Sequence, residues 1–374
     1  MKTGFEQLLD KHKDWLAGKR VALLGHQAAV DAQGRGSAER LRTALGDGLV
    51  ALMGPEHGYD GCAVAGEKVQ GGTHGAWGIP VWSLYGEHRA PTAEMLNGVD
   101  VLVCDLQDLG ARCYTYLATM QLAMEACAKH GVEFIVCDRP VPLPCVVDGP
   151  VVKPGFESFV APAGFAMCTG MTPGEAAAWL AKKRDGVCVA WMEDLPRDAE
   201  RGAGWPEFVA PSPSLRTWES CETYLATVFS EALPAVDIGR GTNVGFRVVG
   251  APWEEGRALA AKLENENLEG VRFHPYSWVA AEGAHKGKVL EGVRLRVTDA
   301  KMFKPVWTSL VMLDVLGSRV WQGEGTRHEW FDALYGGGEI RATLMSGAAR
   351  EELKKLCCAG HEEYLATRAE AIHY

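Results

Sequence analysis

Five short runs of almost continuous apolar residues in the first 140 positions constrain the fold of this chain most. They cover residues 20–26, 49–54, 79–86, 99–107 and 132–140, with helix-like segments at 37–46 and 115–131 between them. Strands that are buried on both faces show such runs, because crossover helices cover both sides of a parallel sheet. The pattern therefore predicts an α/β fold with a parallel sheet in the N-terminal part of the chain.

The pattern changes after about residue 243. Apolar and polar residues alternate in the segments 244–253, 270–278 and 291–299, and helix-like segments lie between them and after them, at 254–267 and 305–317. Alternation is typical of half-exposed strands in antiparallel or mixed sheets. A chain of 374 residues is also long for a single core. We predict one domain over residues 1–243 and a smaller α+β domain over residues 244–374.

Charge and hydropathy exclude several classes of partner. The net charge is −10 and no Lys/Arg-rich run occurs, so nucleic acid and anionic membrane surfaces are not expected to bind. No apolar run reaches the roughly 18 residues of a membrane span. The first 20 residues are charged and lack the pattern of a signal peptide, which indicates a cytoplasmic protein. A periplasmic or secreted location stays open if a signal segment originally preceded them.

The cysteines indicate free thiols. Their number is 11, which is odd, and no C-x-x-C pair occurs. In a reducing compartment such residues behave as small apolar side chains, which we favour over disulfides or zinc ligands.

Polar residues gather where the predicted strands end. Ligands of open parallel sheets bind at the carboxyl ends of the strands, so these residues predict a cleft. The stretch "GPEHGYDGCAVAGE" (54–67) follows the second run and holds two glutamates, a histidine and an aspartate. The candidate residues at these strand ends are Glu56, His57, Glu67, Tyr85, Asp105, Gln107, Asp108, Arg112, Asp138 and Arg139. A plainer interpretation is that they are solvated loop residues.

Several familiar chemistries lack their motifs. The first strand leads into "LLGHQAAV", without the G-x-G-x-x-G of a dinucleotide site, and no Walker motif or G-x-S-x-G elbow occurs. No histidine pair has H-x-x-x-H or H-E-x-x-H spacing, so we predict no cofactor and no metal. A divalent metal on Glu56 and Asp105 stays open as an alternative.

Carboxylate chemistry is what remains. Glycoside hydrolysis needs an acid at the leaving oxygen and a second group that serves as base or nucleophile, or orients the substrate. Glu56, Glu67, Glu87, Asp105 and Asp108 are the candidates in the first domain. Tyr85, Tyr114 and Tyr116 offer faces for sugar rings, although core packing accounts for such aromatic residues equally well.

Longer motifs carry a resemblance to a known family. "GPEHGYDG", "PVWSLYGEHRAPT", "VDVLVCDLQDLGARCYTYLATM" and "VCDRPVPL" occur in order, followed by "GMTPGEAA", "PSPS", "GRGT", "GAPW" and "GVRLRVTD". In this combination the chain resembles the exo-β-N-acetylmuramidase family (NamZ type, glycoside hydrolase family 171). The resemblance implies a Rossmann-like N-terminal domain, an α+β C-terminal domain and a cleft between them. It also implies removal of N-acetylmuramic acid from the non-reducing end of peptidoglycan fragments.

The resemblance also suggests roles for the candidate residues. Glu56 matches the glutamate of the P-E-H-G motif and is expected to be the general acid. Asp105 or Glu67 would orient the attacking water or the 2-acetamido group, and Arg112 or Arg240 would pair with the lactyl carboxylate. The other expected substrate-binding residues are His57, Tyr85, Gln107, Asp108, Tyr114, Tyr116, Asp138 and Arg139.

Four positions depart from the family's usual pattern. Val141 and Ser214 stand where the pattern has asparagine, Thr169 where it has histidine, and Ile238 where it has an acidic residue. These departures keep two alternatives open. One is a non-catalytic protein that binds muropeptides or sugars, and the other is a metal-dependent hydrolase of another class. The sequence leaves the oligomeric state open.

Overall fold

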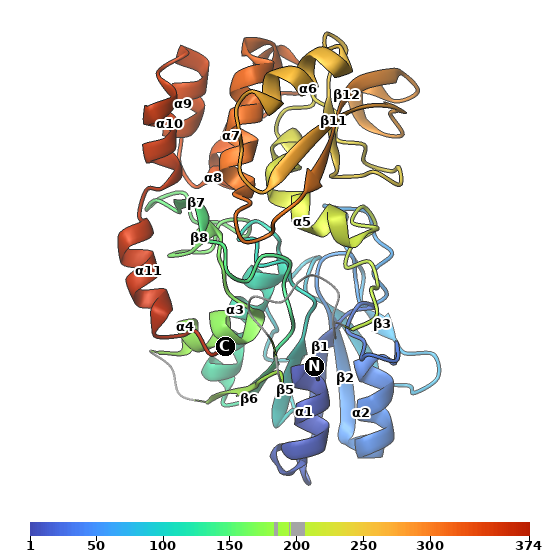
Figure 1. Cartoon of the computed structure of the whole chain (residues 1–374). Coiled ribbons are helices and arrows are strands. Elements are labelled where there is room, and N and C mark those ends of the chain that lie inside the picture. The colour runs from blue at the N-terminus through green and yellow to red at the C-terminus, as the bar shows by residue number, and fades with distance from the viewer. Residues whose placement is uncertain (183–185, 194, 196–205) are drawn as a thin grey trace.

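The N-terminal part of the chain forms a seven-stranded sheet (Figure 1). The computed structural model describes residues 1–182, 186–193, 195 and 206–374. The strand order is β3-β4-β2-β1-β5-β6-β9, and every neighbouring pair is parallel except β3 with β4. The strands are β1 (Val21–Gly25), β2 (Leu49–Gly54), β3 (Gly72–Thr73), β4 (Pro80–Ser83), β5 (Val101–Asp105), β6 (Glu133–Cys137) and β9 (Val187–Ala190). The predicted parallel sheet is confirmed.

Helices cover both faces of this sheet, as the continuous apolar runs predicted. Along β1, Leu23 packs on one side with α1 (Gly4–Lys11) and α2 (Ser37–Leu45). Its neighbour Leu24 packs on the other side, in the core that includes α3 (Tyr116–His130). Gly131 ends α3 with a φ of 68°, a conformation that glycine adopts without steric cost.

The C-terminal part contains a smaller antiparallel sheet in the order β10-β12-β11. Its strands are β10 (Val248–Gly250), β11 (Val271–Val279) and β12 (Val289–Val297). The helices α5 (Trp218–Thr227), α6 (Gly256–Glu264) and α7 (Pro305–Leu316) accompany it, and α5 lies against both α7 and β12. The fold class predicted from the alternating segments is confirmed, whereas the boundary near residue 243 stays a prediction.

The last residues of the chain return to the first sheet (Figure 1). The Tyr374 hydroxyl donates a hydrogen bond of 2.6 Å to Asp138, which directly follows β6.

The remaining elements are β7 (Asp148–Val151), β8 (Ala166–Cys168), α4 (Pro173–Ala181), α8 (His328–Tyr335), α9 (Glu339–Ser346), α10 (Arg350–Cys357) and α11 (His361–Ala369), with short 3-10 turns η1 (Lys13–Leu16), η2 (Gly46–Gly48), η3 (Val228–Glu231), η4 (Gly283–His285) and η5 (Ser318–Gln322). In the described part of the chain, no helix is long and apolar enough to cross a membrane. All eleven cysteines are free thiols.

Candidate active site

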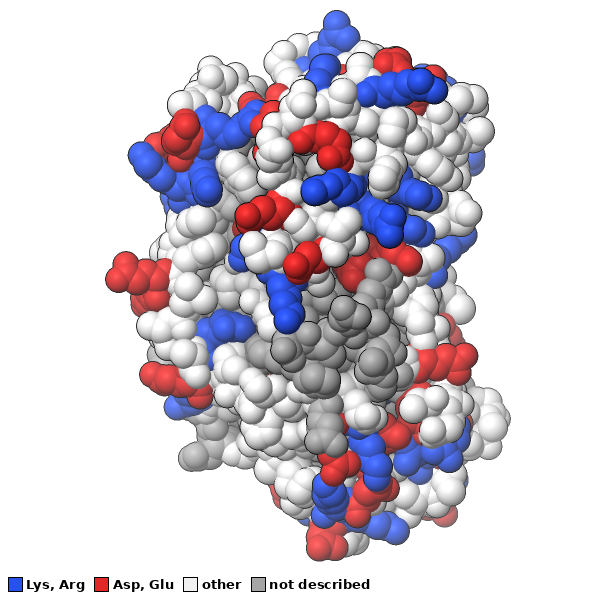
Figure 2. Space-filling model, viewed as in Figure 1, with Lys and Arg blue, Asp and Glu red and all other residues white. Residues whose placement is uncertain are grey.

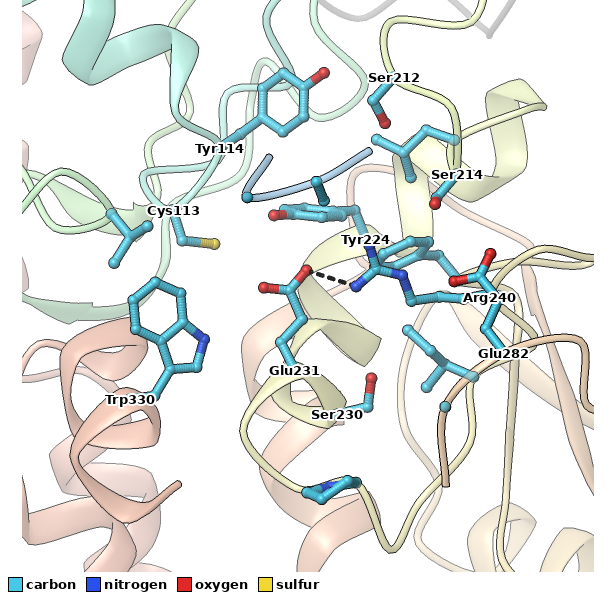
Figure 3. Close-up of a pocket in the computed structure, with 18 of the residues that line it drawn as sticks. Cys113, Tyr114, Ser212, Ser214, Tyr224, Ser230, Glu231, Arg240, Glu282 and Trp330 are labelled. Carbon is cyan, nitrogen blue, oxygen red and sulfur yellow. Dashed lines mark hydrogen bonds and ion pairs between the residues drawn. The ribbon is translucent and has the colours of Figure 1, made fainter. Parts of the chain in front are cut away.

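A cavity of about 460 Å³ lies between the strand ends of the first sheet and the C-terminal part of the chain. Figure 3 shows it from close range. Five of the residues predicted from the sequence line it, namely Glu56, His57, Tyr85, Tyr114 and Arg240. The other lining residues with polar or aromatic side chains are Cys113, Thr115, Ser212, Ser214, Tyr224, Ser230, Glu231, Asp237, Phe246, Glu282, Arg327 and Trp330.

Glu56 is fixed at one wall of this cavity. It lies two residues after the end of β2, and its side chain accepts two hydrogen bonds, from the Gly66 amide at 2.9 Å and from the Thr115 hydroxyl at 2.7 Å. Thr115 is the N-cap residue of α3, so the carboxyl group lies at the positive end of a helix dipole. Both oxygens of the side chain thus accept a hydrogen bond, which fixes its orientation.

The backbone beside Glu56 is strained. His57 has a φ of 71°, and its Nδ1 donates a hydrogen bond of 2.8 Å to the Ala63 carbonyl oxygen. Among the described residues, only three other than glycine have positive φ, and two of them, His57 and Phe246, line the cavity. Such conformations cost free energy and cluster at functional sites, which supports a functional role for this cavity.

Aromatic side chains form another part of the cavity wall. Tyr114 packs edge-on against Tyr224 at 5.8 Å between ring centroids, and Tyr224 lies 5.3 Å from Phe246. Tyr85 lies near Glu56, and burial together with the Glu56 charge raises the pKa of Tyr85. Tyr85 therefore stays protonated, so it can donate its hydroxyl hydrogen. Aromatic faces and hydroxyl groups of this kind suit a sugar ring.

Three further carboxyl groups, those of Glu231, Asp237 and Glu282, line the same cavity, and the sequence analysis did not select them. Glu231 lies at the end of η3, and the Arg240 guanidinium contacts it at 3.3 Å (Figure 3). Burial is the largest influence on Glu231 and raises its pKa. The Glu56 charge adds to this rise, whereas Arg240 and Arg327 oppose it. The charges of Glu56 and Glu231 thus influence each other across the cavity.

Two hydrogen-bond donors in the cavity wall lack acceptors. In the part of the chain that the structure describes, nothing accepts the Nε hydrogen of Arg240 or the indole hydrogen of Trp330, although both nitrogens are buried. Unsatisfied buried donors carry a free-energy cost, which an acceptor on a ligand removes. Their position indicates a ligand that brings acceptor atoms, such as carboxylate or acetamido oxygens.

Asp105 lies outside this cavity, against the prediction that it orients water or substrate. The Arg139 guanidinium binds both of its carboxylate oxygens, at 2.5 and 2.8 Å, and the Ser37 hydroxyl also donates to one of them. Asp105 and Arg139 are completely buried beneath the strand ends. They hold the ends of β5 and β6 to the loop after β1, because Arg139 also donates to the Val30 carbonyl oxygen.

Asp138, like Asp105, contacts other parts of the fold and does not line the cavity. It accepts hydrogen bonds from the Thr172 hydroxyl at 3.0 Å and from the Gly174 amide at 2.7 Å, at the start of α4. Burial raises its pKa to about 7, although the hydrogen bonds from Tyr374, Gly174 and Thr172 oppose the rise. The side chain therefore binds the helix start and the C-terminal residue, not the cavity.

Gln107 and Asp108 turn into the protein instead of the cavity. The Gln107 side chain donates to the Pro140 carbonyl oxygen at 2.8 Å. Asp108 accepts the Gly110 amide at 2.7 Å, and its second oxygen accepts no hydrogen bond from the described residues. Burial raises the pKa of Asp108 to about 7.

Three further predicted residues also lie outside the cavity lining. Arg112 donates to the carbonyl oxygens of Pro150, Phe165 and Leu334 and so joins the N-terminal part to α8. Burial lowers its pKa to about 10. Tyr116 is buried and donates to the Pro211 carbonyl oxygen at 2.9 Å. Glu67 is exposed and accepts the Val64 amide at 3.1 Å within its own loop.

The described residues contain no group of three or more His, Cys, Asp or Glu side chains arranged to hold a metal ion. The alternative of a divalent metal on Glu56 and Asp105 also lacks its geometry, since both Asp105 oxygens are bound by Arg139.

Glycoside hydrolysis typically uses two carboxyl groups at one sugar-sized space. This cavity holds four, those of Glu56, Glu231, Asp237 and Glu282. The fold and the cavity thus define a glycosidase built on a Rossmann-like α/β domain. A family model described as exo-beta-N-acetylmuramidase NamZ, N-terminal, matches residues 21–219, and the corresponding C-terminal model matches residues 222–374. The chain belongs to the exo-β-N-acetylmuramidase NamZ family.

Individual relatives agree with this assignment. The peptidoglycan beta-N-acetylmuramidase NamZ of Bacillus subtilis (strain 168) is 35% identical over 379 residues, which cover 100% of this chain and 91% of that protein. A solved DUF1343 family protein from Bacteroides fragilis has a TM-score of 0.92 at 30% identity, covering 100% of this chain and 98% of the other. A second DUF1343 structure from the same species has a TM-score of 0.76 at 23% identity with the same coverage, and so shows the fold alone.

Proposed function

We propose that this chain removes N-acetylmuramic acid from the non-reducing end of peptidoglycan fragments, with Glu56 and Glu231 as its catalytic carboxyl pair. The observation that carries this proposal is the presence of both side chains on one cavity of about 460 Å³ within a chain of the NamZ family. The volume suits a single sugar residue with its substituents, as exo-action requires.

The surroundings of the two carboxyl groups support different roles. Glu56 accepts hydrogen bonds at both oxygens and so is ready to orient a water molecule or the 2-acetamido group. The raised pKa of Glu231 suits a group that holds a proton for the leaving oxygen. This division of roles differs from the one predicted from the sequence, in which Glu56 was the acid.

Arg240 is our proposed ligand for the lactyl carboxylate of muramic acid. Its guanidinium contacts Glu231 through one nitrogen and leaves the Nε donor unused. A planar guanidinium binds a carboxylate with paired hydrogen bonds. The Arg240 charge opposes protonation of Glu231. A lactyl carboxylate bound to Arg240 would offset that charge and so favour the protonated form of Glu231.

The test compares two substrates with one muramic acid residue and different leaving groups. One is an aryl glycoside with an activated phenol, and the other is a disaccharide with a sugar as leaving group. We expect Glu231→Gln to lose about 10²–10⁴-fold on the disaccharide but far less on the aryl glycoside, which needs little protonation. Glu56→Gln should lose turnover on both substrates, and the matched control Glu94→Gln, at an exposed residue outside the cavity lining, on neither.

Two outcomes would contradict these assignments. A folded wild-type protein that cleaves neither substrate but binds the disaccharide would establish a non-catalytic binding protein. If Glu56→Gln spares the aryl glycoside and Glu231→Gln does not, the two roles are reversed.

A further inference from the structure

The outer face of the C-terminal sheet carries a cluster of basic side chains. Arg272 of β11 pairs directly with Arg296 of β12, and His274 pairs with Arg294. Because side chains alternate along a strand, these four project from one face, while Val271 and Phe273 face the core. We call Arg272, His274, Arg294 and Arg296 the basic face. Figure 2 shows Lys and Arg side chains over the region where Figure 1 places β11 and β12.

The fold itself does not explain this cluster. Like charges directly opposite each other on neighbouring strands are destabilising. Arg272 has a carboxylate at 3.8 Å, that of Glu264, and Arg294 lies 5.5 Å from the centre of the Tyr276 ring. Neither Arg294 nor Arg296 has a carboxylate partner among the residues that the structure describes. In a chain of net charge −10, an uncompensated pair of arginines indicates an external anion.

The basic face continues toward the cavity along β11. Tyr276 and Trp278 share the face with Arg272 and His274, and their rings are nearly parallel, with an interplanar angle of 24°. The Trp278 indole donates a hydrogen bond of 2.7 Å to Asp237, which lines the cavity. From Trp278 to Arg272 the strand spans about 20 Å, at its usual rise per residue. Trp278 is buried, so the accessible part of this strand face begins at the half-buried Tyr276 and runs to the exposed Arg272 and His274.

We propose that the basic face binds carboxylates of the substrate chain beyond the scissile bond, while the terminal sugar occupies the cavity. This inference rests on the proposed function. An exo-acting enzyme encloses one sugar and leaves the rest of the chain outside. Muramic acid residues in that remainder carry lactyl carboxylates, which guanidinium groups bind well. The half-buried Tyr276, over which Arg294 lies at 5.5 Å, is the aromatic side chain between the cavity and the basic face.

The experiment compares short and long substrates. The double variant Arg294→Gln/Arg296→Gln removes two charges outside the cavity, and Arg319→Gln is the matched control, at an exposed arginine of η5. For a peptidoglycan oligosaccharide of several disaccharide repeats, we expect KM to rise about tenfold at low salt in the double variant, with kcat unchanged. The difference should shrink at high salt, because salt screens exposed charges. The aryl glycoside and the control variant should show wild-type kinetics.

The outcomes separate this inference from the proposed function. One outcome is that the double variant shows wild-type kinetics on the oligosaccharide and normal turnover of the aryl glycoside. That result would contradict the proposed binding role of the basic face and leave the proposed function intact. If the wild-type protein cleaves neither substrate, the proposed function is wrong. Calorimetric measurement of oligosaccharide binding to the wild-type protein and to the double variant then still tests the proposed role of the basic face. A loss on the aryl glycoside as well would also contradict the proposal. Circular dichroism checks folding, and Arg296→Gln alone is the fallback variant.

Discussion

Arg139 and Asp105 form a closed pair in which Nε donates to Oδ1 at 2.5 Å and Nη2 donates to Oδ2 at 2.8 Å. Both side chains are removed from solvent. A buried pair of this kind is strongly destabilised when one partner is removed, because the other charge is left uncompensated. Asp105 is the last residue of β5 and Arg139 follows β6, so the pair joins two neighbouring strand ends outside the cavity lining, and its effect on catalysis is expected to be indirect.

Arg139→Leu is expected to lower the free energy of unfolding by about 3–5 kcal/mol. The physical reason is that Asp105 remains buried without its guanidinium partner. Urea unfolding measured by tryptophan fluorescence checks the change. The exposed pair Lys2–Asp10 provides the control, since Lys2→Met removes only a solvent-screened contact and should leave the stability nearly unchanged. An Arg139→Leu protein of unchanged stability would show that the pair does not hold the strand ends.

The sheet could be predicted from the sequence because continuous apolar runs separated by helical segments are typical of buried parallel strands. Glu56 could be placed at the cavity through its position after β2. The same strand-end rule also selected Asp105 and Asp138. It could not show which way each side chain turns, and both turn into the interior, toward Arg139 and α4. Side-chain direction at a strand end depends on tertiary partners that are distant in sequence.

Glu231 was missed in the sequence for a related reason. It lies in a 3-10 turn after α5, where neither a motif nor a strand end marks it, and the packing of α5 on α7 brings it to the cavity. The one available signal was its proximity in sequence to Arg240, an arginine that the resemblance had already selected. That spacing alone predicts no contact, and only the structure shows the ion pair at 3.3 Å.

Thr115→Val is expected to lower kcat by about tenfold with little change in KM. The substitution removes the hydroxyl that donates to Glu56 at 2.7 Å, and a hydrogen bond to a charged group contributes about 1.5–3 kcal/mol. Steady-state kinetics on the aryl glycoside measure the effect. Thr119→Val on the same helix is the matched control, because the Thr119 hydroxyl donates only to the backbone oxygen of Thr115. Equal kinetics for the two variants would argue against the positioning role of Thr115.

Arg240→Lys is expected to discriminate between sugars with and without a lactyl group. KM for the aryl glycoside of N-acetylmuramic acid should rise about tenfold or more, because lysine cannot form the paired hydrogen bonds of a guanidinium. The aryl glycoside of N-acetylglucosamine lacks the carboxylate, and any turnover of that sugar should be unaffected. A parallel loss on both sugars would mean that Arg240 acts through Glu231 and not through the lactyl group.

Ser214→Asn tests whether a departure from the family pattern retunes the cavity. Ser214 and Ile238 line the cavity, whereas Val141 and Thr169 do not. We therefore expect Ser214→Asn, which restores the pattern, to change the ratio of kcat/KM between the two aryl glycosides by several-fold. Thr169→Ser, at a buried residue away from the cavity lining, should leave that ratio unchanged. A ratio that moves equally in both variants would indicate a general effect of packing.

Asp108 should make the stability of the protein depend on pH. Burial raises its pKa to about 7 from 3.8, so the folded state holds a proton between these values that the unfolded state has lost. The stabilisation that this proton gives is complete below about pH 4, falls as the pH rises toward 7, and is lost above that. Asp108→Asn keeps the acceptor for the Gly110 amide and removes the ionisation, so it should flatten this fall and stabilise the protein at pH 7.5.

Urea unfolding of the wild-type and Asp108→Asn proteins at pH 5 and pH 7.5 measures this fall in stability. Asp138 contributes a fall of the same sign, because burial raises its pKa to about 7 as well, so part of the slope should persist in the variant. Asp60→Asn, at an exposed residue, is the matched control and should keep the wild-type slope. A slope that Asp108→Asn leaves unchanged would show that Asp108 is already ionised in the folded protein at pH 5.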